Sequence, residues 1–454
     1  MKHLFLFTIG PVQSFIAQAR KTQDLYAGSK MLSDLVGFAM EKLPEGTDFI
    51  FPIDPCAKSK PNRFVAIVES DDIKKLGNEL KEAVEEEFVT GKEFGKRVND
   101  IYDCKEQFRD FLKVYWAARK VETDTGDNIK DYPSEYKKLE QLMGATKNVR
   151  YFSQFAETGR KCSVSGEYNV KVYRETEDES KADAKPVKGD KNKLFHSDVE
   201  VIGFSQRLIN GVSIHPKHLQ AGEGLCGISL LKRYYKEDYI DKFLATAEIA
   251  TLDTLEQLKK LDVELASKIQ CLLKTDEQFV YEDAITDKSV EKSGNESSIN
   301  TLKEWQKAIF NAAKNQELKL AKHYAILAFD ADSMGKKLGG AKTEEEHKEL
   351  SMLLGDFANN GYGRTVYAGG DDFLGFLNLN YLFLAMQELR KLFDKEVNDK
   401  LDENSFGHLK LTFTAGVAIA HYKTPLSEVL NWARAMEKEA KDIDGIADIE
   451  KLKD

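Results

Sequence analysis

Short apolar runs bounded by turn residues alternate with longer segments of helical period along this chain. Three runs near the start, Lys2–Ile9, Asp48–Ile53 and Arg63–Val68, have the length and composition of strands, and a helix is predicted between the first two. Residues 70–145 are charged and follow a helical period, as do residues 228–320. The pattern therefore predicts strands at the start and helices through much of the middle.

The last third of the chain repeats this order of elements. The run His323–Phe329 predicts a strand, which passes through Asp330-Ala331-Asp332 into a helix start at Ser333–Lys337. The elements predicted after it are a hairpin of Arg364–Val366 and Phe373–Leu377, a helix at Tyr381–Asp399, a strand at Leu409–Ile419 and a helix at Leu426–Lys441. The resulting order, β-α-β-β-α-β-α, is typical of a ferredoxin-like palm with one added helix.

The strands at the start are interpreted as a weaker copy of the same unit. The pair Asp48–Ile53 and Arg63–Val68 takes the place of the later hairpin, but Pro55–Asn62 fills its turn and no acid pair is present. Because strand-turn-helix units are common, a chance resemblance is the alternative. Between the copies, residues 174–193 are too polar to pack and are interpreted as a mobile loop.

The turn of the later hairpin carries two adjacent carboxylates, Asp371 and Asp372, preceded by Gly369 and Gly370. Asp330 ends the neighbouring strand, so we expect these acids to converge. Mg²⁺ usually binds one or two carboxylates together with substrate phosphates, and two such ions can activate a hydroxyl and stabilise a leaving pyrophosphate. Glycines let a nucleotide approach the backbone closely. The pattern indicates a nucleotide polymerase or cyclase site, with an ordinary surface turn as the alternative.

Composition narrows the class of protein. A chain of 454 residues with 42% hydrophobic content is long enough for about three domains with real cores. The net charge of −10 gives no global basic field, so any contact with RNA is expected to be local. The sequence has no apolar run long enough for a membrane span and no cleavable signal. Five scattered cysteines favour a reducing cytoplasm over a disulfide framework.

Short motifs in a fixed order are spread over most of the chain. They are Gly10–Ile16, Ala19–Thr22, Ala27–Ser29, Pro61–Phe64, Leu225-Cys226, Lys232-Arg233, Thr246–Ala250, Asp330–Gly335, His347, Leu350-Ser351, Tyr367–Asp372, Ala418–Lys423 and Pro425-Leu426. Together they resemble the large palm-domain subunit of type III CRISPR effector complexes, in the Cmr (type III-B) branch. The ordered set is far more specific than any single motif in it.

The resemblance implies two cyclase-like palms that face each other and hold two ATP molecules, with metal ligands in the second palm alone. Carried over by position, Asp330, Asp371 and Asp372 are catalytic residues that bind two Mg²⁺ or Mn²⁺ ions. Lys441 is expected to hold the triphosphate, with a solvated charge at a helix C-terminus as the alternative. The other residues expected to bind nucleotide are Gly10, Gln13, Ser14, Ser29, Asp332, Ser333, Gly335, Lys336, Gly369 and Gly370.

Subunits of this kind join nucleotides from ATP when the complex, guided by CRISPR RNA, binds target RNA. Their usual products are cyclic oligoadenylates, second messengers in antiviral defence, and an AMP conjugate is the alternative product. The chain is therefore expected to be a cytoplasmic nucleotidyltransferase whose partners are the other subunits, CRISPR RNA and target RNA. Two alternatives stay open, an autonomous diguanylate-type nucleotidyl cyclase and a catalytically silent scaffold subunit. Two interpretations stay open for three basic residues of the first helices: they contact RNA or ATP phosphates, or they are ordinary solvated side chains. These residues are Arg20, Lys21 and Lys30.

The expected fold class is α+β, with two ferredoxin-like palm domains separated by a mainly helical insert and a degenerate zinc-knuckle region. Residues 1–150 are expected to form the first palm-like domain, with a helical extension and no metal ligands. Residues 151–235 form the zinc-knuckle region with the mobile loop, and residues 236–320 form a helical domain. Residues 321–454 form the catalytic palm with the Gly-Gly-Asp-Asp hairpin.

The chain departs from the family pattern in two places. None of its eight histidines is followed by aspartate, so we expect no His-Asp nuclease domain in it. The two Cys-x-x-Cys pairs of the family's zinc knuckle have become Cys162-x-x-Ser165 and Cys226-x-x-Ser229. Structural zinc normally takes four Cys or His ligands, so zinc is doubtful here unless nearby histidines complete the site. The candidate histidines are His196, His215 and His218.

Two groups of residues are assigned structural roles. Trp116, Trp305 and Trp432 fall in segments of helical period and are interpreted as core residues, not as platforms for stacking bases. His347 and Ser351 are interpreted as a capping or core pair.

Overall fold

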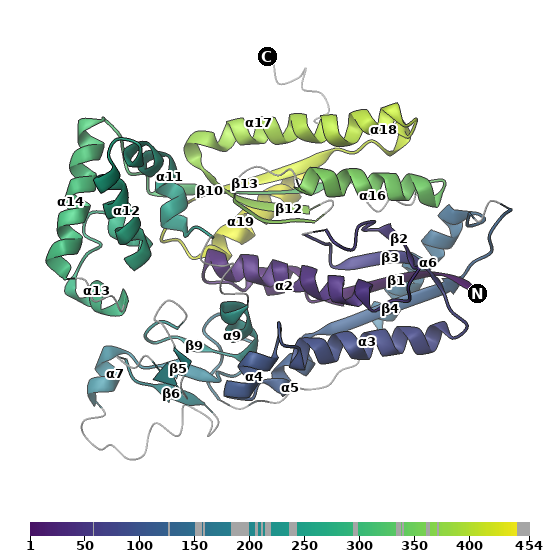
Figure 1. Ribbon diagram of the computed structural model, residues 1–454, viewed down its shortest axis with the longest axis horizontal. Helices are drawn as coiled ribbons and strands as arrows, with labels where there is room; N and C mark the ends of the chain where they lie inside the picture. Colours follow the sequence, from purple (N-terminus) through teal and green to yellow (C-terminus); the bar gives the residue numbers. More distant parts are fainter. Residues whose placement is uncertain are drawn as a thin grey trace.

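The computed structural model describes residues 1–57, 59–125, 128–149, 157, 159–182, 199–204, 208–209, 212–213, 219–235, 243–293, 298–332, 337, 340–359, 364–369 and 372–442. Within these residues, two four-stranded sheets and their helices form the body of the molecule. A helical unit and a region of small sheets lie at one end of it (Figure 1).

The first unit is built on a sheet with the strand order β2-β3-β1-β4. Its strands are β1 (Lys2–Gly10), β2 (Asp48–Phe51), β3 (Arg63–Glu69) and β4 (Lys113–Lys120). Its helices are α1 (Gln13–Ala17), α2 (Thr22–Glu41), α3 (Ile73–Thr90), α4 (Lys96–Tyr102), α5 (Lys105–Phe111) and α6 (Tyr132–Asn148). Adjacent strands are antiparallel, and β1 is buried along both faces between β3 and β4.

The second unit has a sheet with the corresponding order, β11-β12-β10-β13, and again all neighbours are antiparallel. Its strands are β10 (His323–Ala331), β11 (Arg364–Gly369), β12 (Asp372–Asn378) and β13 (Phe413–His421). Its helices are α16 (Glu344–Asn359), η2 (Leu379–Tyr381), α17 (Leu382–Phe393), η3 (Asp394–Asn398), α18 (Asp399–Glu403), η4 (Gly407–Leu409) and α19 (Leu426–Asp442). The predicted hairpin and final helix of this unit are confirmed.

Two hydrophobic cores each contain residues of both sheets. Because side chains alternate along a strand, one face of β1 supplies Phe5 to the first core and the other supplies Leu6 to the second. β10 is divided in the same way, with Ile326 in the first core and Leu327 in the second. The two units are therefore packed through continuous apolar layers.

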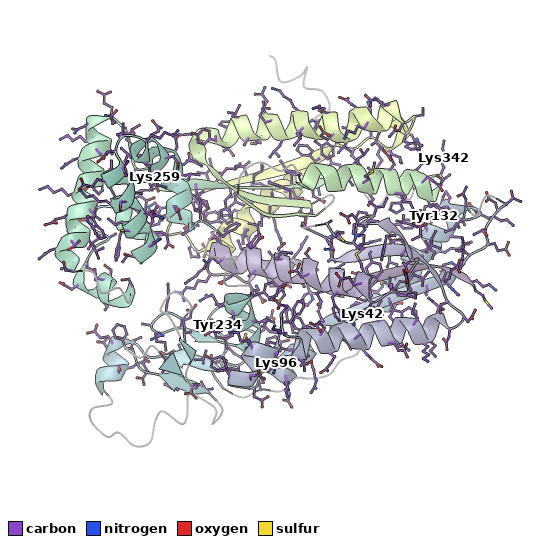
Figure 2. All side chains as sticks on the ribbon, in the orientation of Figure 1. Lys42, Lys96, Tyr132, Tyr234, Lys259 and Lys342 are labelled. Carbon is purple, nitrogen blue, oxygen red and sulfur yellow. The ribbon has the colours of Figure 1, made fainter. Side chains whose placement is uncertain are left out.

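Helix α16 adds polar contacts between the two units. The hydroxyl of Tyr132, at the start of α6, lies 2.7 Å from Nδ1 of His347 on α16, and both side chains are buried. One turn further along α16, Ser351 accepts a hydrogen bond from the backbone N–H of Ile53 at 3.2 Å. Figure 2 shows Tyr132 where the first unit approaches this helix. His347 and Ser351 are both buried, as their interpretation as a core pair predicts, and both join the two units.

The region after the first unit contains short strands and one helix that returns to the body. Its elements are β5 (Val172–Arg174), α7 (Glu177–Ala182), β6 (Glu200–Ile202), β7 (Leu208–Ile209), β8 (Val212–Ser213), β9 (Gly224–Leu225) and α9 (Gly227–Tyr234). β5 pairs with β6 and β9, and α9 packs against α2, α4 and α5 of the first unit.

The helical unit follows, as predicted from the period of residues 228–320. Its elements are α11 (Thr246–Lys259), α12 (Val263–Thr275), η1 (Glu277–Val280), α13 (Asp287–Ser293) and α14 (Ile299–Asn315). These helices enclose a third core, to which Tyr422 of the second unit contributes. The predicted domain boundaries as such stay a prediction.

Several local predictions were wrong. Residues 113–120 form strand β4 and not a helix, because they pair along β1, and Trp116 on this strand stacks on Phe5 with ring centroids 5.8 Å apart. Trp432 on α19 is 47% exposed and is not a core residue. The segment 174–193, predicted to be a loop, contains the last residue of β5, Arg174, and helix α7 in its described part.

Candidate functional site

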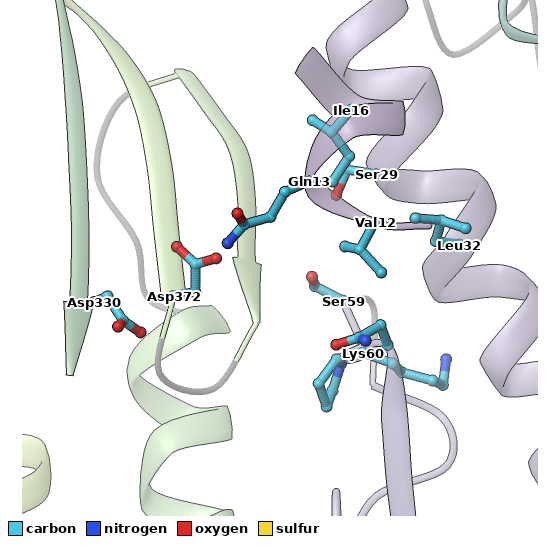
Figure 3. Close-up of a pocket in the computed structure, with 11 residues that line it drawn as sticks. Val12, Gln13, Ile16, Ser29, Leu32, Ser59, Lys60, Asp330 and Asp372 are labelled. Atoms are coloured by element: carbon cyan, nitrogen blue, oxygen red, sulfur yellow. The ribbon is translucent and has the colours of Figure 1, made fainter. Parts of the chain in front are cut away.

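A cavity of about 270 Å³ lies where the first unit meets the ends of β10 and β12. One wall comes from α1, α2 and the connection between β2 and β3, and the other from two strands of the second unit (Figure 3). The residues that line it are Val12, Gln13, Ile16, Ser29, Leu32, Ser59, Lys60, Pro61, Asn62, Asp330 and Asp372. The site is thus shared by segments about 270 or more positions apart along the chain.

Asp330 and Asp372 are direct cross-strand partners in the antiparallel pair of β10 and β12. Residues in such positions have Cα atoms about 4.5–5.5 Å apart, and like charges placed there repel each other. Both side chains reach the cavity. Two converging carboxylates therefore favour a cation at this edge of the sheet.

Lys441, near the end of α19, supplies a positive charge at this position. Its ammonium group donates a hydrogen bond to Asp330 and forms a second ion pair with Glu437 at 3.0 Å. Partial burial lowers the pKa of Lys441, but the hydrogen bonds from its ammonium to Asp330 and Glu437 outweigh burial and raise it above its usual range. The lysine is charged, and its ammonium stands where a cation bound by Asp330 would stand.

Asp332 is held away from this pair by the neighbouring strand. Its two carboxylate oxygens accept hydrogen bonds from the hydroxyls of Thr412 and Thr414, at 2.7 and 2.6 Å. Its backbone N–H donates to the carbonyl of Thr412. The side chain is therefore fixed in one orientation beside Asp330 and does not line the cavity.

The wall from the first unit is ordered by main-chain contacts. Ile9 and Asn62 are joined by a backbone hydrogen bond of 3.0 Å, which brings the end of the β2–β3 connection beside the end of β1. The backbone N–H of Lys60 donates to Ser33 of α2 at 2.8 Å, and its ammonium donates to the carbonyl of Ala57 at 2.7 Å. Burial lowers the pKa of Lys60. The connection is thus pinned between α2 and β1.

The nucleotide-binding residues predicted in the first unit divide into two groups. Gln13 and Ser29 line the cavity, and the Gln13 side chain extends across it toward Asp372 in Figure 3. Gly10 ends β1, and Ser14 is an exposed residue of α1, so neither lines the cavity.

The predicted residues of the second unit are described in part. Gly369 ends β11, where its backbone pairs with Asp372. The predicted residues that lie outside the described part of the chain are Asp371, Gly370, Ser333, Gly335 and Lys336.

Several lining residues carried no prediction as site residues. Ser59, Lys60, Pro61 and Asn62 belong to the connection between β2 and β3, which was noted for its lack of an acid pair and for the motif Pro61–Phe64. The apolar lining residues Val12, Ile16 and Leu32 were assigned no role of their own. The long turn rich in Pro and Asn, placed where the second unit has its acid hairpin, was the signal that could have found the first group.

The four residues predicted to form a degenerate zinc knuckle do come together. The Cys162 thiol lies 3.3 Å from the Ser229 hydroxyl, and the Cys226 thiol lies 3.6 Å from the same hydroxyl and 3.8 Å from that of Ser165. A hydrogen bond from Cys226 lowers the pKa of Cys162 to about 5, whereas burial raises the pKa of Cys226. The described residues contain no cluster of three or more His, Cys, Asp or Glu side chains suited to a metal. The doubt about zinc stays a prediction, and the candidate histidines lie outside the described residues: His196, His215 and His218.

Comparison with known proteins shows which family the chain resembles. The family model described as Cas10/Cmr2, second palm domain, matches residues 323–448, and that of the CRISPR-associated protein Cmr2, N-terminal, matches residues 4–60. Two segments of the chain match the Cas10/Cmr2 family. The resemblance found in the sequence motifs is thereby confirmed. The two matched segments contain most of the cavity's lining on both of its walls.

Similar proteins of this family are longer than this chain. The CRISPR system Cmr subunit Cmr2 of Pyrococcus furiosus is 24% identical over 541 aligned positions, covering 97% of this chain and 60% of the relative. A Type III-B Cmr-beta structure in the apo state has a TM-score of 0.61 at 14% identity, covering 97% of this chain and 67% of its own. Cmr-beta bound to cognate target RNA gives 0.61 at 13% identity, covering 96% of this chain and 68% of its own. Among the described residues, no helix is long and apolar enough to cross a membrane.

Proposed function

We propose that this Cas10/Cmr2 chain is a nucleotidyltransferase that joins nucleotides from ATP in the cavity between its two units. The observation that carries the proposal is the cross-strand pair of Asp330 and Asp372, which faces a wall suited to a nucleotide. The product we expect is a cyclic oligoadenylate, made as a second messenger in antiviral defence. An AMP conjugate is the alternative product of the same chemistry.

The donor set fits Mg²⁺ or Mn²⁺. Asp330 and Asp372 supply hard oxygen ligands, and Asp371 would add a third carboxylate. Two bound ions would activate the attacking hydroxyl and neutralise the leaving pyrophosphate. The present partner of Asp330 is the Lys441 ammonium, whose place a metal ion would take.

The chain's own residues then have separate tasks. Lys441, once freed from Asp330, remains beside Glu437 at the cavity edge, where its charge can bind phosphate oxygens. Asp332, held by Thr412 and Thr414, keeps the end of β10 in register with β13. Gln13 and Ser29 offer an amide and a hydroxyl to the sugar or base of a nucleotide.

The first unit is proposed to be a second palm that holds the acceptor nucleotide. Its sheet has the same strand order as the sheet of the second unit, and its long β2–β3 connection stands where the second unit places its acids. A unit without metal ligands cannot activate a hydroxyl by itself. It can hold that hydroxyl against the metal site, which lowers the entropic part of the barrier.

The partners proposed are the other subunits of a type III CRISPR complex, with CRISPR RNA and target RNA contacted through the complex. One of the similar Cmr-beta structures is bound to cognate target RNA. An autonomous nucleotidyl cyclase is less well supported, because it has no need of the helical unit or the knuckle region. A silent scaffold is less well supported because Asp330 and Asp372 still converge.

Replacement of the acids tests the proposed nucleotidyltransferase activity. Asp330→Ala, and separately the pair Asp371→Ala with Asp372→Ala, should reduce product formation from ATP by about 1000-fold or more, equivalent to roughly 4 kcal/mol of barrier. Mass spectrometry of products formed with Mg²⁺ or Mn²⁺ identifies and counts them. The measurement uses the complex with matched target RNA.

Asp253→Asn is the matched control for this test. Asp253 is a carboxylate of α11 outside the cavity, hydrogen-bonded to Tyr381 and Asn380. Its replacement should leave product formation unchanged. Undiminished products from the Asp330 or the double variant would disprove the assignment of the acids, and absence of any nucleotide product from the unaltered complex would favour the scaffold.

A further inference from the structure

The short helix α1, which presents Gln13 and Ile16 to the cavity, is held from behind by α9. Lys232 of α9 is buried, and its ammonium donates hydrogen bonds to the carbonyl of Phe15 and, at 2.8 Å, to that of Gln18. Carbonyls at the end of a helix lack partners within it. Lys232 supplies these partners for a helix of one turn and a half, which has little stability of its own.

The stem of Lys232 also touches α2, the other helix of this wall. A Cβ added at Gly28 would lie only 3.2 Å from Cε of Lys232, so the stem crosses α2 one residue before Ser29. The ammonium lies 4.1 Å from the centre of the Phe15 ring, within range of a cation–π contact. Lys232 therefore fills the space directly behind both helices of the wall.

Arg233 ties the turn between these helices to the same element. Its guanidinium donates to Asp24 at 2.6 Å and to Glu223 at 3.1 Å, and all three side chains are buried. Asp24 in turn accepts the backbone N–H groups of Arg20 and Lys21, at 3.3 and 3.2 Å. Consecutive residues of α9 thus fix the end of α1 and the beginning of α2.

The position of α9 itself is set by the knuckle and by the first unit. Cys226 stands at the N-cap of α9, in the hydrogen-bonded group with Ser229. The backbone N–H of Gly227 donates to Gln107 of α5 at 2.7 Å, and a Cβ at Gly227 would lie 2.5 Å from that of Cys104. The helix is therefore anchored at its first turn and carries its two cations at its last.

We propose that Lys232 is a positioning residue for nucleotide binding, which acts by holding the Phe15 and Gln18 carbonyls so that Gln13 and Ile16 face Asp330 and Asp372. This inference rests on the proposed function of the cavity. A buried ammonium is costly for stability, and an apolar replacement of it leaves the two carbonyls without their donor. Burial also lowers the pKa of Lys232 to about 8. A lysine placed here at that cost makes directional contacts that an apolar side chain cannot make.

The test compares Lys232→Met with Arg174→Met by calorimetric titration of the full chain with ATP and Mg²⁺. Arg174 is the matched control, because it is also buried and donates to two carbonyls, those of Leu219 at 2.8 Å and Phe204 at 3.2 Å, away from the cavity. Both variants should lose thermal stability. Only Lys232→Met should raise the Kd for ATP, by about tenfold or more, equivalent to roughly 1.4 kcal/mol.

A second variant tests the same role if Lys232→Met does not fold. Gly28→Ala keeps the charge of Lys232 but presses a methyl group against its stem, and it should raise the Kd for ATP at least about threefold. Its control is Gly144→Ala in α6, where the added methyl group meets open space and the Kd for ATP should not change. Equal ATP affinity of each variant and its control overturns the positioning role and leaves the proposed function standing. Absence of ATP binding by the unaltered chain overturns both.

Discussion

His347 is a buried residue at the contact between the two units. It is fully buried, it touches the rings of Tyr132, Tyr136 and Phe51, and burial lowers its pKa to about 3. Among the described residues, its Nε2 has no hydrogen-bond partner. The ring is therefore neutral in the folded protein, and adding a proton would place an uncompensated charge between the units.

This burial predicts a loss of stability in acid. Because the unfolded histidine titrates near 6.5, the unfolded state binds more protons than the folded state between pH 6.5 and about 3, so stability falls as the pH falls through that window. From pH 6.5 to 5 the loss from this residue is about 2 kcal/mol. His347→Gln should remove that part of the slope in urea unfolding curves. His323→Gln, at an exposed position of β10, should keep it, and an unchanged slope in His347→Gln would refute the prediction.

At this scale the residues themselves predicted the acids of the site, and the family resemblance predicted Gln13 and Ser29 on the opposite wall, but nothing predicted Ser59 or Asn62. Asp330 ends an apolar run and Asp372 begins one, so antiparallel pairing alone brings them opposite each other. Ser59 and Asn62 reach the same cavity only because two distant units pack together. Their local sequence shows an unusually long turn, but it does not show which distant strands that turn will meet.

Among the elements, helix α19 can pack closely on β13 only because position 416 of that strand is a glycine. A Cβ at Gly416 would lie 2.1 Å from the Ala433 carbonyl and 2.4 Å from the backbone nitrogen of Glu437, so the helix lies directly on the strand. The same helix carries Lys441 to Asp330. The packing of one helix therefore sets the distance between the lysine and the acid.

Gly416→Ala should consequently lift α19 from the sheet. We expect a loss of about 1–3 kcal/mol in stability from overpacking, and a fall in product formation because α19 carries Lys441 away from the cavity edge, where it is proposed to bind phosphate. Gly144→Ala, inside α6 and with nothing near its added methyl, should instead gain roughly 0.5–1 kcal/mol. Thermal melting and product assays measure both. Equal stability of the Gly416 variant and the unaltered protein would contradict the close packing.

Element prediction succeeded where pattern and pairing agree. The apolar runs of β1 and β10 are central strands buried on both faces, and their length and composition alone identify them. β4 was missed because Lys113–Lys120 follows a helix without Gly or Pro between them, and it becomes a strand only through pairing with β1. Likewise, β13 begins four residues later than the predicted strand at Leu409.

At the scale of the whole molecule, the two units share cores, so activity is expected to depend on small shifts between them and not on separation. A net charge of −10 does not favour strong RNA binding by the chain alone. The RNA signal is therefore expected to arrive through partner subunits and to bias the alignment of the two cavity walls.

The resulting prediction concerns gating. The isolated chain should make little product, and the assembled complex should respond to complementary target RNA with a rise of at least about 10-fold, equivalent to roughly 1.4 kcal/mol of barrier. Product formed per chain is to be measured for the free subunit, the complex, and the complex with matched or unrelated RNA. Equal rates in all four samples would rule out gating and favour the autonomous cyclase.

Both walls of the cavity belong to one polypeptide. Their encounter is an intramolecular event, with an effective concentration set by the chain and independent of how much protein is present. A site assembled from two copies would lose output with the square of its abundance when the protein is scarce. The proposed second messenger would instead be produced in direct proportion to the number of complexes that have bound their target, even when very few are present.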